Sequence, residues 1–170
     1  HNVPGTMSER ILLVGLGKAS EFTAKQYCQA VRASIKALAA GGASNAATFL
    51  AELSIDQLSS RRKVAYLAEA VLDASYKFDA IKRKKDDGKK EDGKKREAKK
   101  GITKLVIYVA QADEVKEAEA GLADGKALAA GVSLAKDLGN LPPNVCTPTY
   151  LAETAESLGK KYDFKVKVLE

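Results

Sequence analysis

The feature that most constrains the fold is a pair of prolines, Pro142 and Pro143, near the end of the chain. Proline cannot continue an α-helix and disfavours the helical conformation in the residue before it, so the helical pattern upstream must stop here. Gly139 stands where a helix C-cap favours a residue that can adopt positive φ. Downstream, Thr147 is a good N-cap and Pro148 suits the first helical position.

These signals predict a helix end, an ordered and extended crossing, and a helix start. A floppy tether would be richer in Gly and Ser than this segment is. We therefore expect a first domain at residues 1–138, a junction at residues 139–148, and the beginning of a second domain at residues 149–170.

Strand patterns alternate with helical patterns along the chain. This alternation predicts the α/β class with a largely parallel sheet. The candidate strands are the apolar run 10–16, expected to be buried on both faces, the weaker run 45–53, the β-prone run 105–109, and 164–169 in the second domain. The candidate helices are residues 23–40, 60–77, 114–138 and 149–161.

The junction residues also resemble those of a known family. The run from Asp137 to Asn144 reads D-L-G-N-L-P-P-N, and Thr147-Pro148 and Leu151-Ala152 follow it. This closely resembles the junction of the leucyl aminopeptidases, the cytosol-aminopeptidase family. A looser similarity extends upstream through residues 10–17 to the V-P-G at residues 3–5.

The resemblance implies a three-layer α/β/α, macrodomain-like N-terminal domain, whose first strands would lie upstream of His1, followed by the first helix and strand of a catalytic domain. It implies a parent enzyme that removes N-terminal amino acids from peptides with two divalent metal ions, zinc or manganese. It further implies a cytoplasmic homohexamer. Because the chain begins at His1, we expect an interior piece of a longer polypeptide, although Met7 is a rival start.

The motifs that hold the metals in this family are not found in these residues. Lys100 to Thr103 reads K-G-I-T, as the first metal motif does, but the continuation from Lys104 to Ile107 is K-L-V-I and lacks the acidic ligand. The second motif is absent, and the only histidine is His1. We therefore predict no catalytic and no metal-binding residue in this segment, and expect its role to be structural and in assembly.

The positive charge of the chain is concentrated in residues 82–100, which hold eleven Lys or Arg and five Asp or Glu, equal to the net +6 of the whole sequence. Such a run cannot bury apolar area, so we expect a mobile loop that folding does not need. The alternative is a polyanion contact, with DNA as the partner, although the run has no aromatic side chain for base stacking. The candidate contact residues are Lys82, Arg83, Lys84, Lys85, Lys89, Lys90, Lys94, Lys95 and Arg96.

The alternative function is a macrodomain-like binding module that contacts nucleic acid through that run, or a nucleotide near residues 15–18. The sequence G-L-G-K at residues 15–18 does not complete a dinucleotide fingerprint, because Ser20 stands where the third glycine belongs. A tight turn between strand and helix is the favoured interpretation.

The remaining signals concern the cellular compartment and contact with a membrane. Cys28 and Cys146 have no metal or redox spacing, which favours two ordinary thiols in a reducing cytoplasm. No window approaches the ~18 consecutive apolar residues of a membrane span. We expect no contact with a membrane.

Overall fold

The computed structural model describes residues 5, 8–78 and 101–169. The basic run 82–100, with its predicted mobility, therefore lies outside the described residues. The chain divides into two compact units, of which the first comprises residues 1–76 and 90–132 and the second residues 77–89 and 133–170. Each unit is described by itself.

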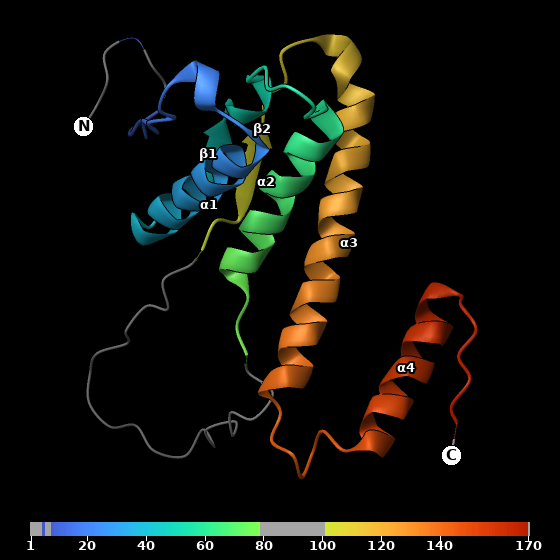
Figure 1. The fold of residues 1–170 in the computed structure, drawn as a ribbon. Coiled ribbons are helices and arrows are strands. Elements are labelled where there is room, and N and C mark those ends of the chain that lie inside the picture. Colours follow the sequence, from blue (N-terminus) through green and yellow to red (C-terminus); the bar gives the residue numbers. More distant parts are fainter. Residues whose placement is uncertain (1–4, 6–7, 79–100, 170) are drawn as a thin grey trace, which may run out of the picture. The chain divides into compact units, whose positions relative to one another are not determined.

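The first unit is an α/β arrangement around a short parallel sheet. Strands β1 (Asn45–Thr48) and β2 (Lys104–Ile107) pair in parallel, with Asn45 opposite Lys104 and Thr48 opposite Ile107. Helices α1 (Ala24–Ala40) and α2 (Ser60–Ser75) lie on one side of this sheet (Figure 1). The predicted α/β class and the parallel pairing are confirmed. The three-layer, macrodomain-like part of the expectation stays a prediction.

Local signals mark both ends of α1 and the start of α2. At the start of α1 the backbone N–H of Thr23 donates to the Gln26 side chain at 3.2 Å, which forms a capping box. Gly42, with φ of 72°, ends the same helix in a conformation that favours glycine. At the start of α2 the Ser59 hydroxyl accepts from the backbone N–H of Arg62.

The core of the first unit lies between α1 and α2. Its largest fully buried side chains are Tyr27, Val31 and Ile35 from α1 and Leu67 from α2. On the sheet, Leu105 and Ile107 pack against this core whereas Val106 is 38 % exposed, so the two strands bury one face.

Helix α3 (Val115–Asn140) starts in the first unit and contacts α2 very closely there. A Cβ atom placed on Gly121 would lie 2.1 Å from the carbonyl oxygen of Arg61, and one on Gly125 would lie 2.5 Å from that of Ala65. Arg61 also holds Asp124 of α3 in a two-point ion pair, with N–O distances of 2.5 and 3.0 Å. The spacing G-x-x-x-G at residues 121–125 is a close-packing signal that the sequence analysis overlooked.

Residues 10–16 do not form the predicted strand. Leu13 is 89 % exposed and Ile11 51 %, so the run is not buried on both faces either. A strand forms only beside a partner backbone, and among the described residues β1 and β2 pair only with each other. Arg10 nevertheless anchors the run, because its guanidinium donates to the carbonyl oxygen of Gly41 at 2.7 Å.

The second unit contains the end of α3 and helix α4 (Pro148–Tyr162). Gly139 was expected to end α3 with positive φ, but the helix runs through it to Asn140. It stops there because Leu141 precedes a proline, which disfavours the helical conformation.

Residues 164–169 do not form the predicted second-domain strand. Helix α4 ends at Asp163, which has φ of 55°, and Phe164 then donates its backbone N–H to Gly159 at 3.0 Å. The chain folds back over Gly159, where an added Cβ would meet Val166 at 2.7 Å. Among the described residues these segments have no strand partner. No helix in the described ranges is long and apolar enough to cross a membrane.

Candidate functional site

The junction is compact rather than extended. The carbonyl oxygen of Pro142 accepts from the backbone N–H groups of Val145 and Cys146, both at 2.9 Å. Pro143 occupies the first central position of this turn, where its fixed φ is favourable. The predicted extended crossing is therefore wrong, although its order is retained by hydrogen bonds that the proline pattern alone did not reveal.

The predicted start of the following helix is confirmed. The Thr147 hydroxyl accepts from the backbone N–H of Tyr150 at 3.3 Å, and Pro148 is the first residue of α4. Both signals are local. Thr147 lies three positions before the N–H group that its hydroxyl satisfies, and Pro148 directly follows the cap. Helix α4 leaves Tyr150 and Leu151 exposed by 37 % and 45 %.

Residues 101–103, the described part of the K-G-I-T segment, lead into strand β2, as predicted. The backbone N–H and the hydroxyl of Thr103 both donate to the carbonyl oxygen of Ser44, at 2.8 and 3.0 Å. Thr103 thereby sets the register in which Asn45 and Lys104 begin the two strands. In the described part of the chain, no three His, Cys, Asp or Glu side chains lie close enough to hold a metal ion.

Residues 15–17 line a cavity of about 340 Å³ beside α1. Gly17 has φ of 77°, which a glycine adopts without strain. The other polar side chains around this cavity are Gln26 and Gln29, and its lining contains no charged residue. Residues 11–18 form neither a strand nor a turn, so the favoured interpretation of a tight turn between strand and helix is wrong. The lining of this cavity has no cation for the phosphates of a nucleotide.

The two cysteines are free and half-buried. Burial raises the pKa of the Cys28 thiol, and the nearby Arg32 and the hydrogen bond with Tyr66 oppose that rise only in part. A thiol with a raised pKa carries little thiolate at neutral pH, so Cys28 is not suited to nucleophilic catalysis. The candidate polyanion contacts at residues 82–96 lie outside the described residues, and their role stays a prediction.

Comparison with known proteins identifies the family. Residues 1–85, half of the chain, match the sequence profile of the cytosol aminopeptidase family, N-terminal domain. The chain belongs to this family.

Similar relatives are probable cytosol aminopeptidases, of Methylobacillus flagellatus with 46 % identity and of Dechloromonas aromatica with 42 %. Each alignment covers 100 % of this chain and 32 % of the relative. The chain thus spans about a third of the length of these relatives and corresponds to their N-terminal region.

Two solved structures of the bottromycin maturation enzyme BotP are similar in fold. The complex of BotP with Mn has a TM-score of 0.61 and 23 % identity, over 88 % of this chain and 27 % of that chain. A second BotP structure has a TM-score of 0.60 and 24 % identity, over 89 % and 28 % of the two chains. At this identity the likeness concerns the fold alone.

Proposed function

We propose that this chain is the N-terminal part of a metal-dependent leucyl aminopeptidase that removes N-terminal amino acids from peptides. The observation that carries the proposal is the alignment of the whole chain with probable cytosol aminopeptidases at up to 46 % identity. The catalytic residues would lie in the part of the enzyme that this chain does not include. Two divalent ions there, zinc or manganese, would activate water and stabilise the tetrahedral intermediate. The Mn found in the BotP complex supports manganese as a candidate.

Within that enzyme the segment has a structural role. Its folded α/β unit carries none of the catalytic motifs, and a hydrogen-bonded turn at Pro142 leads directly into the capped start of α4. We expect this segment to contribute to assembly of a cytoplasmic homohexamer and to limit access of peptides to the catalytic part. The isolated segment is expected to be inactive.

The test is a chimera. The aligned N-terminal region of the Methylobacillus flagellatus relative is replaced by this chain, and hydrolysis of a leucyl peptide is measured with added manganese or zinc. We expect metal-dependent activity and a hexameric mass by analytical ultracentrifugation. The matched control carries Gly131→Ala, a surface change on α3 with open space around it, and should behave like the chimera. A chimera that folds and assembles but cannot cleave the peptide would contradict the proposal.

A DNA contact through residues 82–100 is a second, separate proposal, and the charge concentrated there supports it. Counterion release makes such binding weaken steeply with salt. Replacing Lys82, Arg83, Lys84 and Lys85 with Gln should weaken duplex binding by the chimera and flatten its salt dependence. Unchanged binding and salt dependence would exclude this contact.

A further inference from the structure

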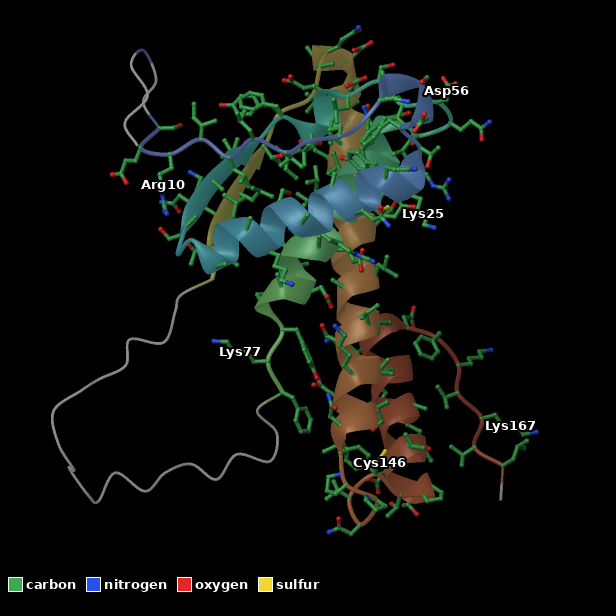
Figure 2. The ribbon with its side chains drawn as sticks, turned by 60° about the vertical axis from the view of Figure 1, so that its left-hand side comes forward. Arg10, Lys25, Asp56, Lys77, Cys146 and Lys167 are labelled. Carbon is green, nitrogen blue, oxygen red and sulfur yellow. The ribbon has the colours of Figure 1, made fainter. Side chains whose placement is uncertain are left out.

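We propose that the first unit binds a small organic anion with an apolar group, in a cavity where α1 and α2 begin. The cavity has a volume of about 850 Å³. Its walls are the loop 53–58 leading into α2, the side chains of Arg62 and Tyr66, and, from the segment leading into α1, Leu16, Gly17, Ala19, Ser20 and residues 22–25. Figure 2 shows Lys25 and Asp56, from these two walls, at the same end of α1, whereas Arg10 lies toward the other end.

The position of this cavity is that of ligand sites in open α/β sheets. The chain leaves the carboxyl end of β1 at Thr48, passes through a short 3-10 helix (Leu50–Glu52), and forms the cavity wall before α2 begins. Ligands of open parallel sheets bind outside the carboxyl ends of the strands. Leu16 and Gly17, from the segment before α1, also line the cavity.

The charged side chains favour an anion. Lys25 and Arg62 both line the cavity, and Asp56 is the single carboxylate among the lining residues. Within the described ranges, neither cation forms an ion pair or a side-chain hydrogen bond with another residue. An arginine and a lysine without partners can bind a carboxylate or a phosphate through charge-assisted hydrogen bonds.

The lining also contains apolar and aromatic side chains, which favour an apolar group on the same ligand. Ile55 and Leu58 are buried, with exposures of 9 % and 7 %, and Phe22 and Tyr66 are half-buried. Small-molecule sites combine apolar and aromatic side chains with convergent polar groups that fix the ligand's orientation. An inorganic ion alone would leave these apolar surfaces in contact with water.

The loop that forms one wall is held in a fixed shape. Gln57 has φ of 61°, a left-handed conformation that is uncommon for a residue other than glycine and persists only where the surroundings enforce it. The ammonium group of Lys63, a residue only 5 % exposed, donates to the carbonyl oxygen of Leu53 at 2.9 Å and fixes the start of the loop. A preformed wall lowers the entropic cost of binding a ligand.

This inference goes beyond the proposed peptidase function, because it concerns only side chains of the first unit and needs no catalytic residue. The probes are phenyl phosphate, which joins a phosphate to a phenyl ring, and N-benzoylglycine, which joins a carboxylate to a phenyl ring through a short amide linker. Their binding to the full 170-residue chain is measured by titration followed with amide NMR signals. Benzyl alcohol, which lacks the charge, and inorganic phosphate, which lacks the ring, are the control ligands.

We expect at least one charged aromatic probe to bind and to shift the amide signals of Gly17, Lys25 and Gln57. Either probe alone supports the proposal and tells which anion is preferred. Loss of a charged hydrogen bond weakens binding about tenfold or more, so the double variant Lys25→Ala with Arg62→Ala should bind at least tenfold more weakly. Lys36→Ala, an exposed lysine of α1 outside the cavity lining, is the matched control and should bind as the parent does.

Three results would overturn the proposal. The first is that neither charged probe binds more tightly than about 10 mM. The second is that benzyl alcohol or inorganic phosphate binds as tightly as the charged probes. The third is that the double variant keeps full affinity while its amide spectrum shows that it is folded.

Discussion

At Gly121 helix α3 lies so close to the backbone of α2 that a single added methyl group should be destabilising. Gly121→Ala places a Cβ 2.1 Å from the carbonyl oxygen of Arg61, whereas ordinary contact begins near 3.4 Å, so the two atoms must separate by about 1.3 Å. The obstacle is backbone on both helices, which cannot rotate away as a side chain can. A separation of this size also pulls on the ion pair between Arg61 and Asp124, one turn along the same contact.

Two opposing effects set the change in the free energy of unfolding. Overpacking a well-filled contact costs about 1–3 kcal/mol. Alanine in a helix interior is favoured over glycine by about 1 kcal/mol. We therefore expect Gly121→Ala to lower the free energy of unfolding by up to about 2 kcal/mol. Gly131→Ala in the same helix has open space around it, so it should raise the free energy of unfolding by up to about 1 kcal/mol.

The assay is urea unfolding followed by far-UV circular dichroism, on the parent chain and both variants. The pair isolates the contact, because both substitutions have the same effect on helix propensity and differ only in what surrounds the new methyl group. If Gly121→Ala stabilised the chain as much as Gly131→Ala does, the close packing of α2 and α3 would be refuted.

Three further predictions concern buried and charged groups. Burial raises the pKa of Tyr27 above its usual 10.0. The neutral phenol therefore stabilises the fold below pH 10.0, and this contribution is lost as the pH rises further. In urea unfolding, Tyr27→Phe should lose less stability at alkaline pH than the parent does. The hydrogen-bonded Arg61 guanidinium lowers the pKa of Asp124 from 3.8. The contribution of the Asp124 carboxylate to the free energy of unfolding is therefore present above pH 3.8 and is lost as the pH falls through the lowered pKa. Asp124→Asn should remove this dependence on acid pH, and an unchanged acid profile would contradict the ion pair. Calorimetry of the isolated chain with zinc or manganese should show no stoichiometric site of micromolar affinity, and such a site would overturn the assignment of the metal ligands to the catalytic part.

The helices could be predicted because their signals are local. Apolar periodicity and the caps at Thr23, Ser59 and Thr147 act within one turn of chain. The Thr147 cap forms as predicted, and the caps at Thr23 and Ser59 are equally local signals that were not predicted. The strand at residues 10–16 failed because an apolar run fixes only a tendency to extend, whereas a strand requires a second backbone. The predicted helix end at Gly139 was wrong because a stronger signal, the proline two residues beyond Asn140, sets the end of α3.

The cavity in the first unit illustrates the limit of reading sites from sequence. Lys25 and Arg62 belong to different helices, and neither stands in a recognisable motif, so only the packing of α1 against α2 shows that they line one space. The left-handed Gln57 had no sequence signal, because its neighbours rather than its own side chain impose that conformation. By contrast, the G-x-x-x-G of α3 could have been recognised from spacing alone.

The last prediction is that Pro142 and Pro143 keep the turn at the junction ordered. Two prolines restrict the unfolded chain, and replacing each by glycine costs about 0.4–1 kcal/mol of stability through chain entropy. The turn that the Pro142 carbonyl closes with Val145 and Cys146 would then open more often. The double change Pro142→Gly with Pro143→Gly should therefore create a protease-sensitive site between residues 141 and 147, while α4 remains folded behind its Thr147 cap.

Pro148→Ala alters the first position of α4 without touching the turn, and it should not be cleaved faster there. In the chimeric aminopeptidase, the double glycine variant should also assemble less completely, as judged by its sedimentation. A double variant that resists cleavage between residues 141 and 147 as well as the parent does would show that the prolines do not maintain the order of this junction.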